Sequence, residues 1–314
     1  MQYKTINGQQ LPMMTLGTVQ LGMRYGINNK VGQPSMESSF SLLSSALENG
    51  VNALDTSRDY GTSEDVLGAF IRTLDTPPFV VTKFNIHGAH GTEGQSIERE
   101  IDECFAASLE HLGMDKIGCY LLHNGKEIFK YEQPIMRVLR RILDSGKAQM
   151  AGMSVYTKQE IDRFLELDDL SAIQVPMSIF DQRLIAGGDI ERLAAAGKTV
   201  FVRSVFLQGL CFMDPNNIAI PELEPYIKPY LLKLQEYASI EGMSIGQLCV
   251  SYIRDIPGVT SLVLGAETRE QVQQNVALID GPPLSNDIRS KISAEFSSFP
   301  FDPVMAVLAN HYGK

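Results

Sequence analysis

The chain has 314 residues, of which 44% are hydrophobic and 20% are charged, a composition typical of a globular protein with one large domain or two smaller ones. Its formal net charge of −10 argues against a nucleic-acid partner, because there is no basic excess to neutralise phosphates. The N-terminus lacks a basic region followed by an apolar segment, and no apolar run approaches the roughly 18 residues that span a bilayer. We therefore expect no membrane association and a cytoplasmic location.

Two sequence patterns alternate along most of the chain. Short apolar runs, typical of buried parallel strands, are found at 13–18, 52–56, 79–84, 117–123, 148–155, 172–176, 199–205 and 260–265. Segments with helical periodicity are found at 35–49, 63–74, 96–112, 132–145, 157–165, 189–196, 229–241, 244–254 and 268–279. Eight strands alternating with helices predict an α/β fold, a parallel (β/α)8 TIM barrel, rather than an open doubly wound sheet.

The two ends of the chain lie outside this alternation. Residues 1–14 predict a small β-hairpin with "NGQQLP" at 7–12 as its turn, ahead of the first barrel strand. Residues 282–314 predict a helix followed by a tail containing Pro and Phe, which could pack on the barrel or cover a site. No internal repeat or linker is evident, so residues 1–314 are expected to form a single domain.

The sequence offers little evidence for a metal or disulfide site. The four cysteines, which have neither zinc-site nor redox-pair spacing, are Cys104, Cys119, Cys211 and Cys249. We expect core thiols, with Cys211 nearest to the expected active-site face. His87 and His90 could be metal ligands, but their glycine-rich surroundings favour a solvated loop, and no metal is expected.

Ionisable residues stand at the ends of three consecutive predicted strands. Asp55 ends the second strand and Tyr60 follows in the next loop, while Lys83 ends the third strand and His123 the fourth. Each residue alone could be an ordinary turn or surface residue. The active site of a (β/α)8 barrel lies at the carboxyl ends of its strands, so we expect these four side chains to converge.

The four residues together suit the protonation of a carbonyl oxygen. Tyr60 is the candidate acid, and a buried Lys83 ammonium would lower its pKa from the usual value of about 10. Asp55 would keep Lys83 charged, and His123 would donate a hydrogen bond that orients the substrate oxygen. None of the four is an electron source, so a reduction would need hydride from a nicotinamide cofactor.

Seven motifs occur in the order found in the aldo-keto reductase family, which the chain resembles over nearly its whole length. They are "LDTSRDYGTSEDVLG", "VVTKF", "YLLH", "GMSVY", "IQVPMSIFD", "RSVFLQGL" and "LGAETREQVQQN". The resemblance implies a (β/α)8 barrel with an N-terminal hairpin and NAD(P)H-dependent reduction of an aldehyde or ketone. It also implies that Asp55, Tyr60, Lys83 and His123 are the catalytic residues, with Tyr60 as the acid.

The same resemblance implies a cofactor site. Its expected residues are Gly17, Thr18, Asp55, Ser154, Gln174, Arg203, Ser204, Leu207, Gly209, Gly265, Glu267, Gln271, Gln274 and Asn275. The first two would line the nicotinamide, and Ser154 and Gln174 would hydrogen-bond its carboxamide. Residues 204–209 would wrap the pyrophosphate, and residues 265–275 would hold the adenosine, where a helix N-terminus also suits an anionic group.

Three departures from the family pattern affect the cofactor site. Val155 stands where the family often has Asn, and Arg203 stands where it often has an aromatic residue that stacks on nicotinamide. A guanidinium can also stack, but it would equally favour an anionic substrate or bind the pyrophosphate. The segment that commonly binds the NADPH 2′-phosphate has Glu267 and Gln271, with only Arg269 basic nearby. NADP(H) is thus the family default, and NAD(H) is a live alternative.

The substrate is less defined by the sequence than the reaction. Arg24 and Tyr25, together with 28–29, form a polar rim after the first strand. With Tyr60 and His123 they would bind a small carbonyl substrate, and a polar rim suits a sugar or polyol-type carbonyl.

Two other functions remain open at this point. The chain could be a nicotinamide-binding regulatory protein that senses redox state with little turnover. Less favoured is a lyase that forms a Schiff base on Lys83. The sequence does not indicate the oligomeric state.

Overall fold

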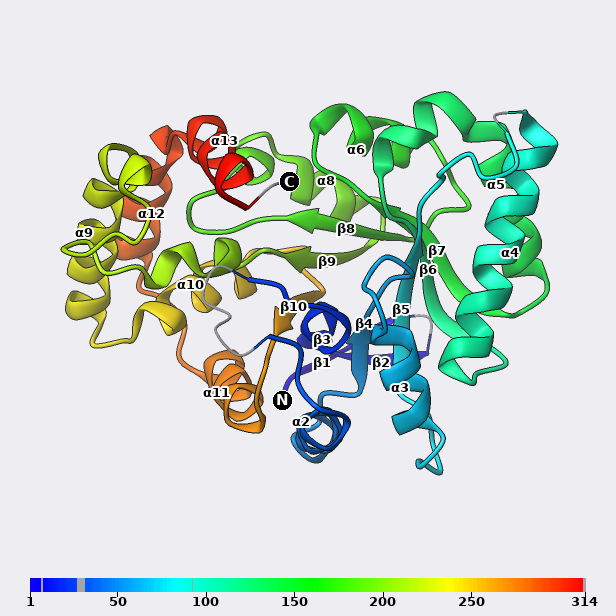
Figure 1. Cartoon of the computed structure of the whole chain (residues 1–314). Coiled ribbons are helices and arrows are strands. Elements are labelled where there is room, and N and C mark those ends of the chain that lie inside the picture. The colour runs from blue at the N-terminus through cyan, green and yellow to red at the C-terminus, as the bar shows by residue number, and fades with distance from the viewer. Residues whose placement is uncertain (7, 27–31, 92, 313–314) are drawn as a thin grey trace.

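The computed structural model of the chain describes residues 1–6, 8–26, 32–91 and 93–312, and its centre is a closed barrel of eight parallel strands (Figure 1). In order around the wall these are β3 (Met14–Gly17), β4 (Ala53–Asp55), β5 (Phe79–Phe84), β6 (Ile117–Leu122), β7 (Ala148–Ser154), β8 (Ala172–Pro176), β9 (Thr199–Arg203) and β10 (Ser261–Gly265). β10 pairs with β3 and closes the barrel. The predicted TIM barrel and the positions of its strands are confirmed.

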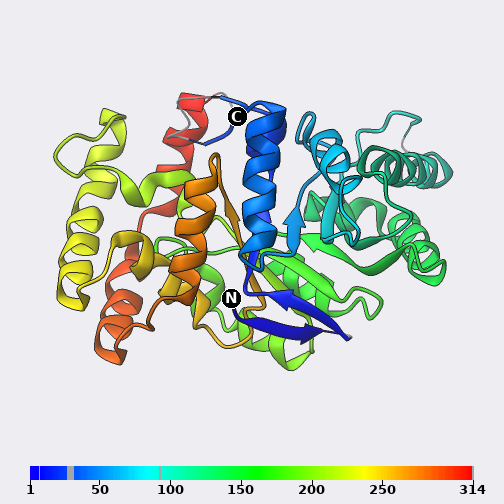
Figure 2. The same ribbon diagram turned by 90° about the horizontal axis from the view of Figure 1, so that it is seen from below.

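Helices cover the outside of the barrel. The predicted ones are α2 (Met36–Glu48), α3 (Ser63–Ile71), α4 (Gly94–Leu112), α5 (Ile128–Asp144), α6 (Lys158–Leu165), α8 (Asp189–Ala195), α9 (Glu224–Glu241), α10 (Ile245–Arg254) and α11 (Arg269–Asp280). Short helices were not expected at α1 (Val19–Gly22), α7 (Arg183–Ala186), η1 (Gly125–Glu127), η2 (Leu207–Phe212) and η3 (Pro221–Leu223). α2 and α11, far apart in sequence, lie side by side (Figure 2).

Two helices begin before their predicted starts, and proline explains both differences. α9 was predicted from Pro229, but Pro225 fits its first turn, where no N–H partner is needed, and Pro229 lies inside the helix. In α5, Tyr131 has non-helical backbone angles (φ −127°, ψ 28°) just before Pro134. The regular part of α5 therefore begins where the periodicity indicated.

The C-terminal tail, to which the sequence analysis assigned no secondary structure beyond a first helix, is itself helical. α12 (Asn286–Glu295) and η4 (Phe296–Ser298) lead into α13 (Phe301–Tyr312). Phe299 stacks on Phe180 after β8, with ring centroids 4.6 Å apart, and meets Tyr230 of α9 edge-on at 5.0 Å. These ring contacts anchor the segment to the barrel, as the sequence allowed.

The N-terminal hairpin closes the amino end of the barrel (Figure 2). β1 (Tyr3–Ile6) pairs antiparallel with β2 (Gln9–Pro12), so residues 9–12 form a strand and not part of the turn. Leu11 of β2 packs with buried side chains from the barrel interior, namely Ala53, Phe79, Val81, Cys119, Leu121, Met150, Ala172 and Phe201. We call this cluster the apolar plug.

The alternation of side chains along a strand places polar groups above the apolar plug. On β5, Phe79 and Val81 belong to the plug, so Lys83 is the next residue on the inward side. The same two-residue step turns four further polar residues inward at the carboxyl ends of their strands: Asp55, His123, Gln174 and Arg203. The polar layer of the barrel thus lies at the end where (β/α)8 enzymes have their sites.

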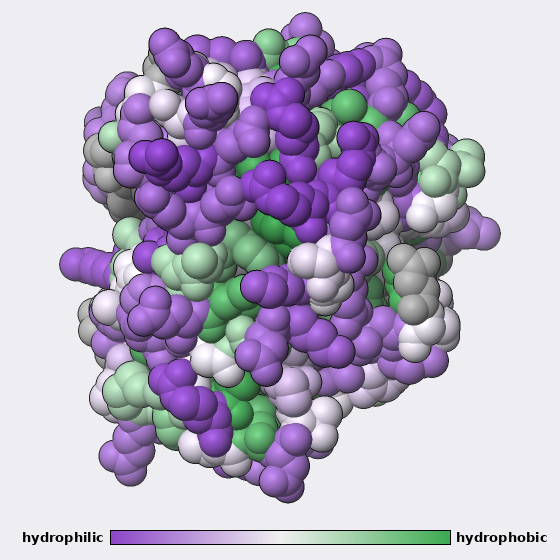
Figure 3. Space-filling view, turned by 90° about the vertical axis from the view of Figure 1, so that its right-hand side faces the viewer, coloured by the Kyte–Doolittle hydropathy of each residue, from purple (hydrophilic) through white to green (hydrophobic). Residues whose placement is uncertain are grey.

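The outer face that carries α4 and α5 is mainly hydrophilic (Figure 3). Ion pairs join the two helices, with Arg137 2.7 Å from Glu98 and Arg141 2.5 Å from Asp102. In the parts of the chain that the structure describes, no helix has the length and apolarity to cross a bilayer.

Gly152 of β7 tests how tightly the barrel wall is packed. A Cβ at Gly152 would lie 1.6 Å from the carbonyl oxygen of Ala172 on β8, so Gly152→Ala must displace a strand. We expect it to lower the free energy of unfolding by about 2–3 kcal/mol, measured from urea denaturation followed by circular dichroism. The control is Gly94→Ala, whose Cβ would meet only the end of the Arg137 side chain, at an ordinary contact distance of 3.6 Å. Equal stability of the two variants would contradict this packing.

Candidate active site

The four candidate catalytic residues lie together at the carboxyl end of the barrel. Lys83 Nζ donates to Asp55 Oδ1 over 2.7 Å and to the Thr56 carbonyl oxygen over 2.8 Å. The same nitrogen lies 5.0 Å from the centroid of the Tyr60 ring. The Tyr60 and His123 rings meet nearly perpendicularly, with centroids 5.6 Å apart. The arrangement therefore places a phenol and an imidazole beside a buried ion pair.

The ion pair is buried, with Lys83 0% and Asp55 3% exposed. Burial lowers the pKa of Lys83, and the adjacent Asp55 carboxylate opposes that effect. The second oxygen of Asp55 accepts a hydrogen bond of 2.7 Å from Gln174 Nε2. Because both carboxylate oxygens have partners within the protein, Asp55 is placed to stabilise Lys83 rather than to act on a substrate.

The expected lowering of the Tyr60 pKa is wrong in sign. Burial raises the pKa of Tyr60, and the Asp55 carboxylate raises it further, while Arg203 opposes both. The charge of Lys83 is compensated by Asp55, which explains why the lysine does not activate the phenol as the sequence analysis expected. The Tyr60 phenol is therefore protonated at neutral pH.

His123 is held by a group that the sequence analysis missed, the carboxylate of Asp59. His123 Nδ1 lies 3.3 Å from Asp59 Oδ2 and 3.1 Å from Ser57 Oγ. Asp59 also contacts His87 Nε2 at 3.5 Å and accepts a hydrogen bond from the Asn85 amide. The hydrogen bond to His123 is the main cause of the lowered pKa of Asp59. With Nδ1 engaged, Nε2 is the nitrogen available to a substrate.

One feature of the sequence pointed to Asp59. It directly precedes Tyr60, so a residue that serves the site from the same loop is plausible. Loops, however, have no periodicity that tells which side chains point inward, and the partner His123 is 64 residues away.

The loop that carries Tyr60 is shaped by close backbone contacts. Gly61 has a φ of +57°, and a Cβ there would lie 2.3 Å from the Gly22 carbonyl oxygen of α1. Thr18 Oγ1 donates to the Asp55 carbonyl oxygen over 2.8 Å and contacts Ser63 Oγ at 2.9 Å. Thr18, expected beside the nicotinamide, is thus fully buried and ties the ends of β3 and β4 to α3.

The segment expected to wrap the pyrophosphate has an unusual backbone. Three non-glycine residues with left-handed φ lie in it, namely Ser204 (65°), Leu207 (43°) and Gln208 (57°), followed by Gly209 (96°). Such conformations are costly for residues with a Cβ and cluster at ligand-binding segments. The preceding Arg203 stacks on Tyr156, with Cζ 4.3 Å from the ring centroid.

The segment after β10 is held in shape by its own helix. Asn275 Nδ2 donates to the Gly265 carbonyl oxygen over 3.1 Å, and Gln271 Oε1 accepts from the Glu267 N–H over 2.6 Å. Gln274 is exposed on α11. Arg269, the basic residue nearest to this segment, pairs with Glu48 at 2.8 Å.

Two observations in this region fit a bound nucleotide. The first is the close approach of Gly265 to Gln20, because a Cβ at position 265 would lie 2.6 Å from Gln20 Nε2. The second is that Gln20 Oε1 is buried without a hydrogen-bond partner among the described residues. The segment with left-handed φ values follows β9, which pairs with β10, so it lies at the same end of the barrel as Gly265. The residues present can therefore accommodate the cofactor that the sequence implies.

The predicted rim residues are only partly described. Tyr25 is half-buried. Burial raises the pKa of its phenol, and the nearby Tyr60 phenol raises this pKa further. Arg24 is exposed. Asn28 and Asn29 lie outside the described residues.

The histidines and cysteines outside the site have ordinary partners. His90 Nε2 lies 2.6 Å from Glu103, and no cluster of metal-ligating side chains occurs in the described ranges. The four cysteines are free thiols. Cys211 of η2 hydrogen-bonds to Cys249 of α10, and this contact, with burial, raises the pKa of Cys249.

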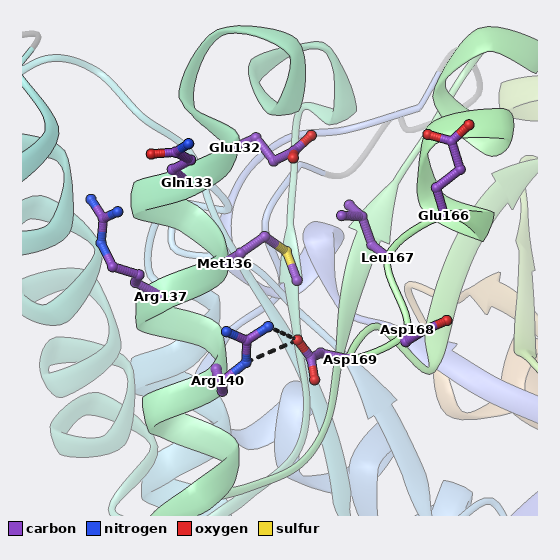
Figure 4. A pocket seen from close by; sticks show the side chains of 9 residues that line it. All are labelled: Glu132, Gln133, Met136, Arg137, Arg140, Glu166, Leu167, Asp168 and Asp169. Carbon is purple, nitrogen blue, oxygen red and sulfur yellow. Dashed lines mark hydrogen bonds and ion pairs between the residues drawn. The ribbon is translucent and has the colours of Figure 1, made fainter.

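A hollow of about 470 Å³ on the outside of the barrel, between α5 and the segment after α6, is unrelated to this site (Figure 4). Several of its charged side chains already have partners: Arg140 contacts Asp169, and Glu132 pairs with Arg163 at 2.5 Å. None of the candidate catalytic residues lines it.

Comparisons with known proteins agree with the geometry. The family model described as "Aldo/keto reductase family" matches residues 13–294. The chain is 25% identical to a probable voltage-gated potassium channel subunit beta of Arabidopsis thaliana, over 96% of this chain and 99% of that protein. It is 27% identical to an NADH-specific methylglyoxal reductase of Escherichia coli, over 74% of this chain and 79% of that protein. Its fold is similar to that of the aldo-keto reductase AKR11C1 from Bacillus halodurans in its holo form, with a TM-score of 0.77, 22% identity and coverage of 94% and 96%.

Asp59→Asn tests the interaction between the Asp59 carboxylate and the His123 imidazole. Burial lowers the pKa of His123 and the Asp59 carboxylate opposes that effect, so removing the charge should lower this pKa further. The measurement is an NMR titration of the imidazole signals. Glu103→Gln, which removes the carboxylate beside His90, is the matched control and should leave the His123 titration unchanged. A His123 pKa that stays constant or rises in Asp59→Asn would refute the assignment.

Proposed function

The chain belongs to the aldo/keto reductase family, whose members are NAD(P)-dependent oxidoreductases, and we propose that it reduces a small aldehyde or ketone to the alcohol with Tyr60 as the proton donor. The observation that carries this proposal is the juxtaposition of the Tyr60 phenol, the His123 imidazole and the buried Lys83–Asp55 pair at the mouth of the barrel.

In this proposal each residue has a defined role in the protonation. His123 Nε2 binds and orients the carbonyl oxygen, while Asp59 holds the other ring nitrogen. As the carbon–oxygen double bond opens, its electron pair moves to oxygen, and the Tyr60 O–H transfers its proton there. The phenolate left on Tyr60 lies beside the Lys83 ammonium and regains a proton from solvent. When bound, the reduced nicotinamide supplies the hydride to the carbonyl carbon.

The buried environment of Lys83 argues against a Schiff-base lyase. The lysine is 0% exposed, and its nitrogen donates to both Asp55 and the Thr56 carbonyl. A lysine nucleophile needs a neutral amine that reaches the substrate. The Lys83 side chain has neither feature in this structure.

For the cofactor we propose NADH in preference to NADPH. Arg269 is already paired with Glu48, and the half-buried Glu267, whose pKa is raised by burial, stands in the segment expected to face the adenosine ribose. A carboxylate there favours a free 2′-hydroxyl over a phosphate. The similar Escherichia coli protein is named as NADH-specific, which is consistent with this proposal.

Tyr60→Phe tests whether Tyr60 is the proton donor. Loss of the hydroxyl should lower kcat for aldehyde reduction by roughly 100-fold or more, with little change in cofactor binding. The measurement is NADH oxidation at saturating methylglyoxal and glyceraldehyde. Tyr226→Phe, at an exposed position on α9, should retain full activity. Full activity of Tyr60→Phe would exclude the acid assignment, and tight cofactor binding without turnover of any carbonyl would favour a regulatory function.

Glu267→Lys tests the cofactor preference. The wild-type protein should bind NADH more tightly than NADPH, measured by enhancement of the cofactor's own fluorescence, and the variant should shift the ratio of dissociation constants towards NADPH by roughly tenfold. Glu270→Lys, at an exposed site in the first turn of α11, makes the same charge change as a control. Tighter binding of NADPH by the wild-type protein would contradict the proposal.

A further inference from the structure

We propose that Arg203 forms an anion-binding subsite within the active site, and that the carbonyl substrate carries a carboxylate or similar anionic group that Arg203 holds. This inference rests on the proposed function and specifies the class of substrate. It concerns a position where the sequence left three uses open, namely stacking on nicotinamide, binding of the pyrophosphate and binding of an anionic substrate.

The position of Arg203 directs its side chain towards the site. It ends β9 two residues after Phe201, which belongs to the apolar plug, so both side chains leave the strand on the inward face. The charge of Arg203 lowers the pKa of Tyr60, of Tyr25 and of Lys83. The guanidinium therefore lies within electrostatic range of all three groups.

Arg203 lacks the carboxylate that a half-buried arginine normally has. Its two hydrogen bonds are long and go to neutral oxygens, to Ser204 Oγ at 3.4 Å and to the Val155 carbonyl at 3.5 Å. No carboxylate lies within 4.0 Å of it among the residues that the structure describes. By contrast, Arg58 pairs with Glu64 at 2.7 Å.

Among the described residues of the site, Arg203 is therefore a cation that no carboxylate contacts. Asp55 compensates Lys83, and Asp59 is engaged by His123, so neither carboxylate serves Arg203. A charge withdrawn from water is costly unless a partner of opposite sign compensates it. An anionic group on the ligand would supply that partner.

Stacking on Tyr156 fixes the guanidinium in a geometry suited to a carboxylate. Tyr156 follows β7, is 48% exposed, and covers the face of the guanidinium at 4.3 Å. Stacking on a ring leaves the N–H groups along the edge of the guanidinium free to donate in its plane. A carboxylate can accept two such parallel hydrogen bonds. The exposure of Tyr156 places this subsite at the rim, where a substrate enters.

The test compares two aldehydes of the same length, anionic 4-oxobutanoate and neutral butanal, with wild-type protein, Arg203→Met and Arg203→Lys. The wild-type protein should prefer 4-oxobutanoate by roughly tenfold or more in kcat/KM. Arg203→Met should remove this preference by raising KM for 4-oxobutanoate more than KM for butanal, and Arg203→Lys should retain part of the preference. Arg99→Met, which removes an exposed arginine of α4, should behave as the wild type.

Three results would overturn the subsite. The first is an absence of preference for 4-oxobutanoate in the wild-type protein. The second is weaker cofactor binding by Arg203→Met with an equal loss for both aldehydes, which would assign Arg203 to the cofactor. If neither aldehyde is reduced, the proposed reductase activity is contradicted, but the anion-binding subsite is not. Calorimetric measurement of 4-oxobutanoate binding then tests the subsite separately. Binding that Arg203→Met abolishes would support the subsite, and no binding by the wild type would be the third contrary result.

Discussion

The site depends on one interaction, the buried ion pair between Lys83 and Asp55. An ammonium in the closed interior of a barrel is tolerated only with a charged partner and satisfied hydrogen bonds. Asp55 supplies the charge, while the Thr56 carbonyl and the Gln174 amide complete the hydrogen bonds around the pair. Asp55 thus favours the charged form of Lys83, while burial of Tyr60 and the nearby Asp55 carboxylate raise the pKa of the phenol, so that Tyr60 stays protonated.

The pair exists because the barrel is built in layers. Neighbouring parallel strands bring residues of adjacent motifs into register, with Asp55 of β4 opposite Val81 of β5 and Lys83 one inward step further. Below this layer, Leu11 of the hairpin and the rest of the apolar plug exclude water from the amino end. The ends of the strands are then held by side chains such as Thr18, which bonds to the backbone of Asp55. A residue expected to bind the cofactor thus also maintains the geometry of the catalytic layer.

Periodicity predicted the barrel and the position of Asp55, Lys83 and His123 at the carboxyl ends of its strands, because strand spacing and two-residue alternation are local properties of the chain. What it missed depends on contacts between distant segments or on burial. Gln174 reaches Asp55 across 119 residues, and no local pattern shows that contact. Asp59 lies in a loop without periodicity. The sign of the Tyr60 pKa shift was wrong because burial, which the sequence does not give, raises this pKa, and the Asp55 carboxylate raises it further.

In the mechanism that we propose, the buried pair of Lys83 and Asp55 lies beside the acid Tyr60, and Arg203, which no carboxylate contacts among the described residues, binds the substrate. The most direct test of this account is an NMR titration of the Tyr60 phenol with 13C-labelled tyrosine in wild-type protein and in Asp55→Asn. We expect a pKa above the ordinary value in the wild type, because burial and Asp55 both raise it, and a lower one in Asp55→Asn, because the negative charge is lost. A wild-type pKa below the ordinary value that Asp55→Asn leaves unchanged would contradict it.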